Sequence, residues 1–296
     1  MADNMRLIIV SGLSGSGKTV ALHVLEDLGY YCVDNMPAAL IGAVVEEVQS
    51  GSDQKVAQMA LGVDARNRAN DLHALPERIR ELQASGVQTD LLFLHASDEV
   101  LMKRYSESRR RHPLADHGTA LRTAIETERD LLADLVDAAD LIIDTSRTSV
   151  YELADAISER VDQRGDDQLS VLIESFGFKN GIPADADFVF DMRGLPNPYW
   201  TIELRGLTGK DKEVSDFLDA QPAVNDMYED VLAFLSRWIP RYNDAHRSYL
   251  TVAIGCTGGQ HRSVYMTERL AAALRDEHDP VLARHNELGS HPIEKQ

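Results

Sequence analysis

The stretch at residues 12–19 limits the fold of this chain more than any other feature of its sequence. It follows an apolar run at residues 7–10 and precedes an amphipathic run at residues 20–27, which together predict a strand, a loop and a helix. Its residues follow the pattern G-x-x-x-x-G-K-T and are Gly12, Leu13, Ser14, Gly15, Ser16, Gly17, Lys18 and Thr19. This pattern between a strand and a helix predicts a P-loop, a phosphate-binding loop for ATP or GTP.

The residue types in this loop indicate its chemistry. Glycines let backbone N–H groups point at a phosphate, and a helix N-terminus adds positive potential. We expect Lys18 to reach the β- and γ-phosphates and the hydroxyl of Thr19 to bind Mg²⁺. A P-loop also needs a carboxylate near the metal, and Asp64, after the apolar run at residues 59–63, is the best-placed candidate for this role. Asp34, after the run at residues 30–33, faces the same sheet edge and is instead a candidate contact for an acceptor or a base.

Short apolar runs alternate with longer helical stretches in the first half of the chain. The runs at residues 7–10, 30–33, 59–63, 91–94 and 141–143 have strand length, which predicts a buried parallel sheet with crossover helices. The polar stretch at residues 162–167 predicts a linker. Further strands are expected at residues 170–175, 188–191 and 249–254, and helices at 214–218, 224–238 and 263–275. The sequence therefore predicts an α/β protein, with a P-loop nucleotide-binding domain at residues 1–163 and a second α/β domain at residues 169–296.

Composition narrows the class of protein and its partners. The 296 residues are 44% hydrophobic and 26% charged, as in ordinary soluble proteins of two domains. Two cysteines give no disulfide framework, and the sequence shows neither a signal-peptide pattern nor an apolar run of membrane-spanning length. We expect a cytoplasmic homo-oligomer without membrane contact. The net charge of −18 repels phosphate backbones and therefore argues against RNA as a partner.

Basic residues crowd together after residue 102 of this acidic chain. One hypothesis is a solvated helix face paired with Glu99 and Glu107. The other is a lid in which Arg109, Arg110 and Arg111 supply charge to a transferring phosphoryl group. The sequence supports both equally. The cluster contains Lys103, Arg104, Arg109, Arg110, Arg111 and His112.

A second glycine-rich loop lies between the predicted strand at residues 249–254 and the helix that follows. It is a candidate anion site and fits the pattern C-x-x-G-x-x-R-S of the cysteine phosphatases, in which a thiolate attacks phosphorus and the arginine binds the oxygens. However, Gly255 stands where those enzymes usually have His, and no partner acid is evident. The pattern therefore favours binding of a phosphorylated ligand over cysteine catalysis. The candidate residues are Cys256, Thr257, Gly258, Gly259, His261, Arg262 and Ser263.

A proline-rich loop at residues 191–200 is a weaker candidate site. Its prolines limit its conformations, so it either closes a core or brings Arg193 and Asn197 to a polar ligand.

Several of these segments together resemble the RapZ/YvcJ family of P-loop nucleotide-binding proteins. The resemblance spans nearly the whole chain and rests on residues 12–19, 32–35, 64–67, 109–113, 174–179, 195–198 and 255–264. It implies binding and hydrolysis of both ATP and GTP. By the family pattern, residues 12–19 are assigned to ATP binding. The segment assigned to GTP binding is Asp64, Ala65, Arg66 and Asn67.

The resemblance also implies folds and partners. The N-terminal half is similar to nucleoside-monophosphate kinases, with the arginine cluster as the lid, and the C-terminal domain resembles a sugar-phosphate-binding fold. Some RapZ members bind a small regulatory RNA and an amino-sugar phosphate, and present the RNA to a ribonuclease.

This sequence departs from the family pattern at three places. From Leu169 onward it has 13 Lys and Arg against 19 Asp and Glu, without the basic C-terminus of the RNA-binding members. Tyr199 replaces a His found in some of them. His95 stands where the family usually has Asp, which would matter if that Asp rather than Asp64 served the metal.

The sequence thus predicts a slow nucleoside-triphosphate hydrolase that uses ATP, GTP and Mg²⁺ and has a regulatory role. One alternative is an adaptor that binds RNA and an amino-sugar phosphate with little turnover. Another is a small-molecule kinase with Asp34 near the acceptor.

Overall fold

The computed structural model of the chain divides into two compact units, Met1–Asp162 and Gln163–Gln296. It describes residues 5–50, 56–108, 110–115, 119–161, 168–245 and 247–288. The predicted linker at residues 162–167 lies outside these residues, and each unit is considered by itself.

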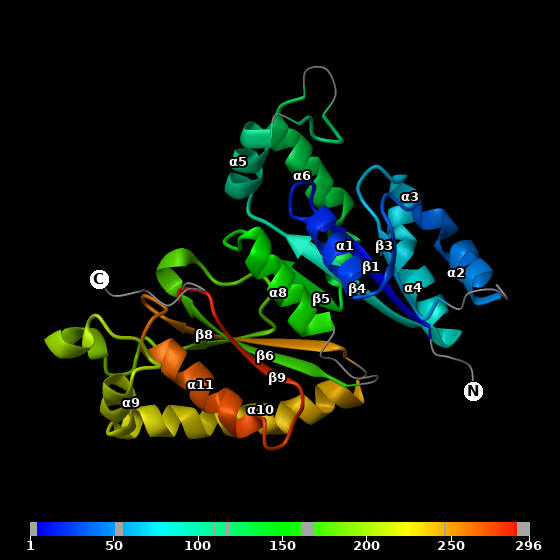
Figure 1. The fold of residues 1–296 in the computed structure, drawn as a ribbon. Coiled ribbons are helices and arrows are strands. Elements are labelled where there is room, and N and C mark those ends of the chain that lie inside the picture. The colour runs from blue at the N-terminus through cyan, green and yellow to red at the C-terminus, as the bar shows by residue number, and fades with distance from the viewer. Residues whose placement is uncertain are drawn as a thin grey trace. The chain divides into compact units, whose positions relative to one another are not determined.

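The first unit alternates strands and helices, as its sequence pattern predicts (Figure 1). Its strands are β1 Arg6–Gly12, β2 Tyr31–Val33, β3 Gln58–Gly62, β4 Gln88–His95 and β5 Leu141–Asp144. Its α-helices are α1 Lys18–Asp27, α2 Ile41–Ser50, α3 Ala69–His73, α4 Leu75–Ala84, α5 Asp98–Ser108, α6 Leu121–Leu131, α7 Ala133–Asp137 and α8 Val150–Val161, with a 3-10 turn, η1, at Ala38–Leu40.

The five strands form one sheet in the order β2-β3-β1-β4-β5, and every neighbouring pair is parallel. The central strand β1 is buried along its whole length. Because parallel strands end at the same edge of a sheet, the loops after them meet there. The topology therefore brings the loop after β1 to the same edge as Asp34, Asp64 and His95.

Side chains along β1 alternate between two core layers, because successive residues of a strand face opposite sides. Leu7 and Ile9 belong to a cluster that includes buried residues of α2, α3 and α4. Ile8 and Val10 are also buried, on the opposite side of the sheet. There α1 and α8 pack against each other (Figure 1). Helices thus cover both faces of the sheet, which leaves its strand ends as the place for a site.

The second unit is a smaller α/β layer structure. Its strands are β6 Ser170–Gly177, β7 Phe188–Asp191, β8 Tyr249–Cys256 and β9 Val281–His285, in the parallel order β7-β8-β6-β9. Helix α11 packs against β6, β8 and β9 and also against α10. Its α-helices are α9 Lys212–Asp219, α10 Pro222–Asp244 and α11 Arg262–Leu274, and its 3-10 turns are η2 Phe178–Asn180, η3 Pro198–Trp200 and η4 Ile202–Leu204.

The predicted α/β class and the parallel sheet predicted for the first half are confirmed, and the second sheet is parallel as well. Strand β9 was not expected, because Arg284 and His285 interrupt its apolar pattern. In the structure Arg284 forms an ion pair with the fully buried Glu174 of β6, at 2.6 Å between Nη2 and Oε2, so a charged residue belongs to this strand. Within the described residues, no helix is both long and apolar enough to cross a lipid bilayer.

Candidate functional site

The loop at residues 13–17 leads from β1 directly into α1, which begins at Lys18. Gly12 ends β1 with φ of 143° and lies so close to β4 that a Cβ atom would collide with the backbone of Leu94. Gly17 precedes the helix in the left-handed region, with φ of 113°. No described side chain caps this helix end. The first N–H groups of α1 are therefore available to an anion.

Lys18 folds back over this loop. Its Nζ donates a hydrogen bond to the carbonyl oxygen of Gly12 at 2.6 Å. Burial lowers the pKa of Lys18, while the negative charges of Glu128, Asp64 and Asp34 act in the opposite direction. The ammonium group thus sits among oxygen acceptors, and phosphate oxygens are acceptors that bind such a donor strongly.

Three other predicted residues of the site face the protein interior. Leu13 and Ala65 belong to the hydrophobic core of the first unit, at 1% and 2% exposure. Ser16 is fully buried. These three residues shape the loops from inside, and the N–H groups of Leu13 and Ser16 already donate to the carbonyl oxygens of Leu94 and Leu13.

Asp64 follows β3 and is 7% exposed. One carboxylate oxygen accepts a hydrogen bond from the backbone N–H of Arg66 at 3.0 Å, and the other lies 3.6 Å from Nε of Arg66. Thr19 is exposed in the first turn of α1. A hydroxyl and a carboxylate are hard oxygen donors, which Mg²⁺ accepts together with phosphate oxygens and water. The donor set at this edge therefore fits Mg²⁺, although no described group of three His, Cys, Asp or Glu side chains could hold a metal.

The segment at residues 64–67 is tied to the loop after β2 through Asn67. Oδ1 of Asn67 accepts a hydrogen bond from the N–H of Ala38 at 2.7 Å. Nδ2 of Asn67 donates to the carbonyl oxygens of Met36 at 3.3 Å and Asp64 at 3.2 Å. Because an amide group has two N–H donors, both are used inside the protein. Asn67 therefore builds the loop, and the side chain of Arg66, which is 62% exposed, is the one that reaches solvent.

Two residues that the sequence analysis did not assign to the site hold the P-loop from outside. Arg104 of α5 donates to the carbonyl oxygen of Gly15 at 2.9 Å and to that of Thr145 at 2.6 Å. Thr145 donates its hydroxyl hydrogen to the carbonyl oxygen of Ser16 at 2.8 Å. Because a trans peptide unit is planar, fixing the carbonyl of Ser16 also fixes the N–H of Gly17, which points the opposite way. Arg104 and Thr145 thus orient the backbone of the P-loop just before α1 begins.

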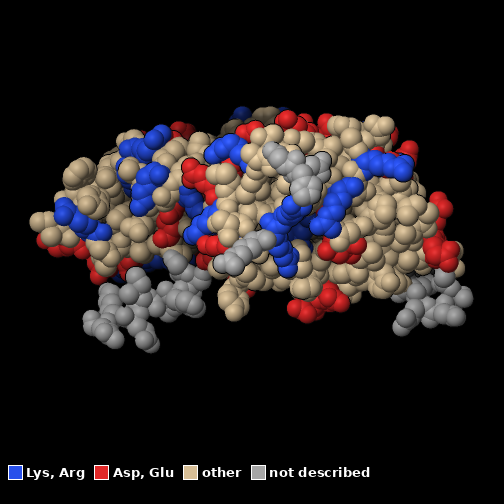
Figure 2. All heavy atoms as spheres, turned by 90° about the horizontal axis from the view of Figure 1, so that it is seen from above, with Lys and Arg blue, Asp and Glu red and all other residues tan. Residues whose placement is uncertain are grey.

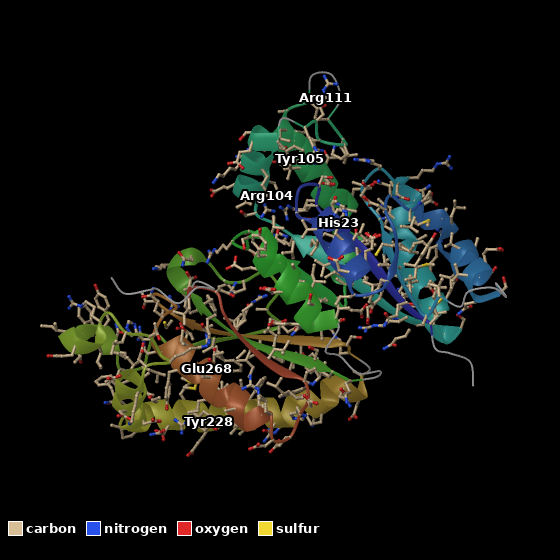
Figure 3. The ribbon with its side chains drawn as sticks, in the orientation of Figure 1. His23, Arg104, Tyr105, Arg111, Tyr228 and Glu268 are labelled. Atoms are coloured by element: carbon tan, nitrogen blue, oxygen red, sulfur yellow. The ribbon has the colours of Figure 1, made fainter. Side chains whose placement is uncertain are left out.

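The basic cluster after residue 102 divides into parts with different environments. Arg104 contacts the P-loop, whereas Arg110 and Arg111 are exposed. Figure 3 shows Arg104 near the loop and Arg111 farther out. Figure 2, which looks onto α5 and α6 from above, shows several Lys and Arg side chains near the middle of this face. Arg109 lies outside the described residues. The cluster is therefore neither wholly a solvated helix face nor wholly a lid.

A buried carboxylate, Glu128 of α6, also reaches the loop. It is 0% exposed and accepts hydrogen bonds from the backbone N–H of Ser14 at 2.9 Å and from its hydroxyl at 2.7 Å. Nε2 of His112 lies 3.0 Å from the same carboxylate. The sequence gives no local signal for this contact, because 114 positions separate Ser14 from Glu128.

His95 ends β4 and is paired in the sheet with Asp144 of β5. Burial lowers the pKa of His95, although the charge of Asp144 opposes this effect. An imidazole with a lowered pKa is neutral near pH 7. His95 therefore does not add a fixed positive charge beside the P-loop.

The second glycine-rich loop surrounds the thiol of Cys256, which is 2% exposed. Sγ accepts a hydrogen bond from the N–H of Gly259 at 3.2 Å and lies 3.1 Å from the hydroxyl of Ser263. Burial raises the pKa of Cys256, but the hydrogen bonds from Ser263 and Gly259 and the charge of Arg262 outweigh it, and the pKa lies below its usual value. Gly259 has φ of 73°, and a Cβ atom there would lie 2.7 Å from the N atom of Gly177. The tight loop therefore favours a negative charge at its centre.

Arg262 begins α11 and is only 4% exposed. Its Nη1 donates to the carbonyl oxygens of Arg193 at 3.0 Å and Leu195 at 2.9 Å, and its Nη2 donates to the hydroxyl of Thr257 at 3.3 Å. The buried Nε has no hydrogen-bond partner within the described part of the chain. The guanidinium therefore joins two loops and keeps one donor for a further acceptor.

His261 does not point into this loop. Its Nε2 lies 3.1 Å from the carbonyl oxygen of Leu204, and burial lowers its pKa. A contact of the His261 ring with a bound anion, as its place among the candidate residues predicts, therefore needs the ring to leave this buried position.

The loop at residues 191–200 is held by its own contacts. The guanidinium of Arg193 pairs with both carboxylate oxygens of Asp191 and lies 3.7 Å from the ring centroid of Phe178. Oδ1 of Asn197 accepts a hydrogen bond from the N–H of Tyr199 at 3.3 Å. The side chains of Arg193 and Asn197 are therefore both engaged within the protein. The carbonyl oxygen of Arg193 accepts a hydrogen bond from Arg262.

The sequence matches known protein families and relatives along nearly its whole length. Residues 5–165 match the model of the RapZ-like N-terminal domain, and residues 169–289 match the model of the RapZ C-terminal domain. A Halorhodospira halophila relative named "Nucleotide-binding protein" is 52% identical over 97% of this chain and 99% of its own length. A Stutzerimonas stutzeri (strain A1501) relative of the same name is 49% identical over 96% of this chain and 100% of its own length.

Solved structures are more distant. Shikimate kinase from Acinetobacter baumannii, in complex with shikimate, is 19% identical, with a TM-score of 0.33 over 53% of this chain and 93% of its own. A gluconokinase from Sinorhizobium meliloti is 16% identical, with a TM-score of 0.33 over 53% of this chain and 90% of its own. Likenesses this weak carry no information on activity, whereas the family models and the relatives span almost the whole sequence. The chain belongs to the RapZ family.

Proposed function

We propose that the first unit binds ATP and GTP together with Mg²⁺ and hydrolyses them slowly, and that the protein has a regulatory role. The observation that carries this proposal is the uncapped start of α1, with Lys18 folded over a loop whose backbone is held from outside. Relatives about half identical to this chain are named nucleotide-binding proteins, which supports it.

The residues divide the work of binding between them. The N–H groups at the start of α1 bind a phosphate, and Lys18 exchanges its contact with Gly12 for phosphate oxygens. Thr19 and Asp64 would hold Mg²⁺, whose charge offsets that of the phosphates. Arg110 and Arg111 remain candidates for a lid, because their side chains are exposed.

The GTP assignment of residues 64–67 rests on the family resemblance. In this structure Arg66 is its exposed member, with Nη1 donating to Oδ1 of Asn35 at 3.2 Å. We propose that Arg66 makes the contact to the nucleotide and that Asn67 supports it.

We propose a phosphorylated small molecule, such as a sugar phosphate, for the loop around Cys256. Arg262 favours this class of ligand, because its buried Nε retains a donor beside a thiol that already prefers negative charge. The acidic second unit disfavours RNA. For this reason an RNA-binding adaptor with little turnover is the alternative and not the function proposed for the protein.

A small-molecule kinase is a further candidate because of Asp34. Its carboxylate lies so close to Gly62 that a Cβ there would be 2.6 Å from Oδ1, and its charge acts on Lys18. An acceptor hydroxyl near Asp34 would then take the phosphoryl group instead of water.

Titration of the pure protein with fluorescent ATP and GTP analogues, with and without Mg²⁺, tests the proposal. We expect Mg²⁺-dependent binding and slow release of phosphate without any added acceptor. Binding without turnover would favour the adaptor, and ADP release that requires a hydroxylated acceptor would favour the kinase. A titration that shows no binding of either nucleotide would contradict the proposal.

A further inference from the structure

A buried chain of polar contacts joins the P-loop to the segment at residues 110–115. Ser14 donates twice to Glu128, from its backbone N–H at 2.9 Å and from its hydroxyl at 2.7 Å. The ring of His112 meets the same carboxylate at 3.0 Å, and the side chains of His112 and Glu128 are both 0% exposed. Water is therefore excluded from the connection between the loop and this segment.

The hydrogen bonds define which nitrogen of His112 carries the proton. The backbone N–H of Leu114 lies 3.2 Å from Nδ1 and points at it. Nδ1 must therefore be the unprotonated acceptor, and Nε2 carries the hydrogen that it donates to Glu128. The donors run from Leu114 to His112 and from His112 to Glu128, so each member of the chain has a defined orientation.

A buried carboxylate persists only when hydrogen bonds and charges compensate its lost hydration. Burial raises the pKa of Glu128, but the hydrogen bonds from His112 and Ser14 and the charge of Lys18 outweigh it, so the pKa lies below its usual value. The carboxylate in turn is the strongest of the charges that keep Lys18 protonated. Removing any one partner leaves the others unsatisfied, which makes the chain of contacts cooperative.

We propose that Glu128 is a positioning residue that couples the segment at residues 110–115 to the phosphate loop. Nucleotide affinity then depends on His112, although His112 contacts Glu128 and not the loop itself. Because coupling between two sites is reciprocal, nucleotide binding must also stabilise the segment. This inference rests on the proposed binding of nucleotide to the first unit.

The first experiment is a double-mutant cycle read by the affinity for a fluorescent ATP analogue with Mg²⁺. The variants are His112→Asn, Ser14→Ala and the double variant. His73→Asn is the matched control, since His73 also pairs with a carboxylate of the same unit, Asp134 at 2.5 Å, but on the exposed surface. We expect each single variant to weaken binding about fivefold. The double variant should bind no more weakly than the single variant with the lower affinity, and the control should bind as the wild type does.

Thermal unfolding of the same variants separates positioning from stability. A purely structural role would lower the melting temperature of His112→Asn and leave the affinity of the folded protein unchanged, which would overturn the inference. Additive losses in the double variant would also overturn it. If the wild type binds no nucleotide at all, the proposed function fails before the cycle begins.

Hydrogen exchange of the wild-type protein provides a test that needs no variant. We expect saturating ATP with Mg²⁺ to slow exchange at the N–H of Leu114 as well as at Gly17 and Lys18. Slower exchange at the P-loop with unchanged exchange at Leu114 would show that nucleotide binds without coupling. Unchanged exchange at both places would count against nucleotide binding itself.

Discussion

Two glycine-rich loops in this chain each lead from a buried parallel strand into a helix, yet they place their cations differently. In the first unit Lys18 makes its contact with the loop itself, at Gly12. In the second unit Arg262 donates to carbonyl groups of another loop, at Arg193 and Leu195. The lysine can exchange its partner without disturbing other segments, whereas the arginine is part of the framework.

The difference extends to what holds each loop. The P-loop is oriented from outside by Arg104, Thr145 and Glu128. The second loop closes around its own thiol, with Gly259 and Ser263 directed at Sγ of Cys256. The first arrangement suits a large ligand that replaces the lysine contact, and the second suits a small anion beside a fixed arginine. The same local motif therefore predicts an anion site but not its size.

The largest expected effect is the loss of nucleotide turnover in Lys18→Ala. Lys18 is the cation that folds over the loop, and without its ammonium group turnover should fall about a hundredfold or more. The melting temperature should also fall, because the buried carboxylate of Glu128 loses the nearby charge of Lys18, so turnover is compared with binding of the protein that remains folded. Lys212→Ala, at an exposed lysine of α9, is the control. If Lys18→Ala turned over nucleotide as fast as the wild type, Lys18 would not be the exchangeable phosphate contact that distinguishes the first loop from the second.

Arg262→Ala should weaken binding of phosphate or a sugar phosphate by about tenfold or more, since a charge-assisted donor is lost. It should also lower the melting temperature, because the carbonyl groups of Arg193 and Leu195 lose their donor. Calorimetric titration and thermal unfolding measure both effects. Arg269→Ala removes another partly buried arginine of α11 and should leave anion binding unchanged. Undiminished binding in Arg262→Ala would make the second loop purely structural.

Thr145→Val should weaken nucleotide binding about fivefold, because the carbonyl of Ser16 loses one hydrogen bond and the Gly17 N–H loses its fixed direction. The substitution keeps the shape of the side chain, so the fold should remain. Thr127→Val is the matched control, since Thr127 donates only to Thr123 on the exposed face of α6. Equal affinities of the two variants would remove Thr145 from the group that orients the loop.

The smallest effect concerns the two cysteines. Cys256 has a lowered pKa, whereas burial and the charge of Glu26 raise the pKa of Cys32 to about 11. Because the thiolate is the reactive form, the rate of alkylation should rise with pH around a lower midpoint for Cys256 than for Cys32. Mass spectrometry after short exposure to iodoacetamide at a series of pH values measures both profiles. A midpoint for Cys256 at or above that of Cys32 would contradict the description of the second loop.

The sequence predicts the strands and the P-loop because their signals are local. An apolar run beside a glycine-rich stretch reveals β1 and α1, although the helix begins at Lys18, two residues earlier than the apolar pattern indicates. The same locality explains the missing prediction of β9, whose Arg284 becomes acceptable only when Glu174 is known to lie opposite it.

The residues that orient the P-loop are not predictable in this way. Arg104 is 89 positions from Gly15, and Thr145 is 129 positions from Ser16. Arginine and threonine on a helix or after a strand have no pattern that distinguishes a loop contact from a solvated side chain. Only the sheet order, which brings the ends of β1, β4 and β5 together, reveals them.

Strand order also has a consequence for how the chain folds as it leaves the ribosome. All strands of the first sheet have been synthesised once β5 ends at Asp144, so this unit can assemble while the rest is still being made. In the second sheet β6 is synthesised first but lies between β8 and β9. Ser170 therefore cannot pair until Tyr249 has been made, and Val171 cannot pair until Val281 has been made. Such distant pairing slows folding. The nascent second unit therefore exposes an apolar strand, β6, until β8 and β9 have been made, and this is the stage at which a chaperone would have most to bind.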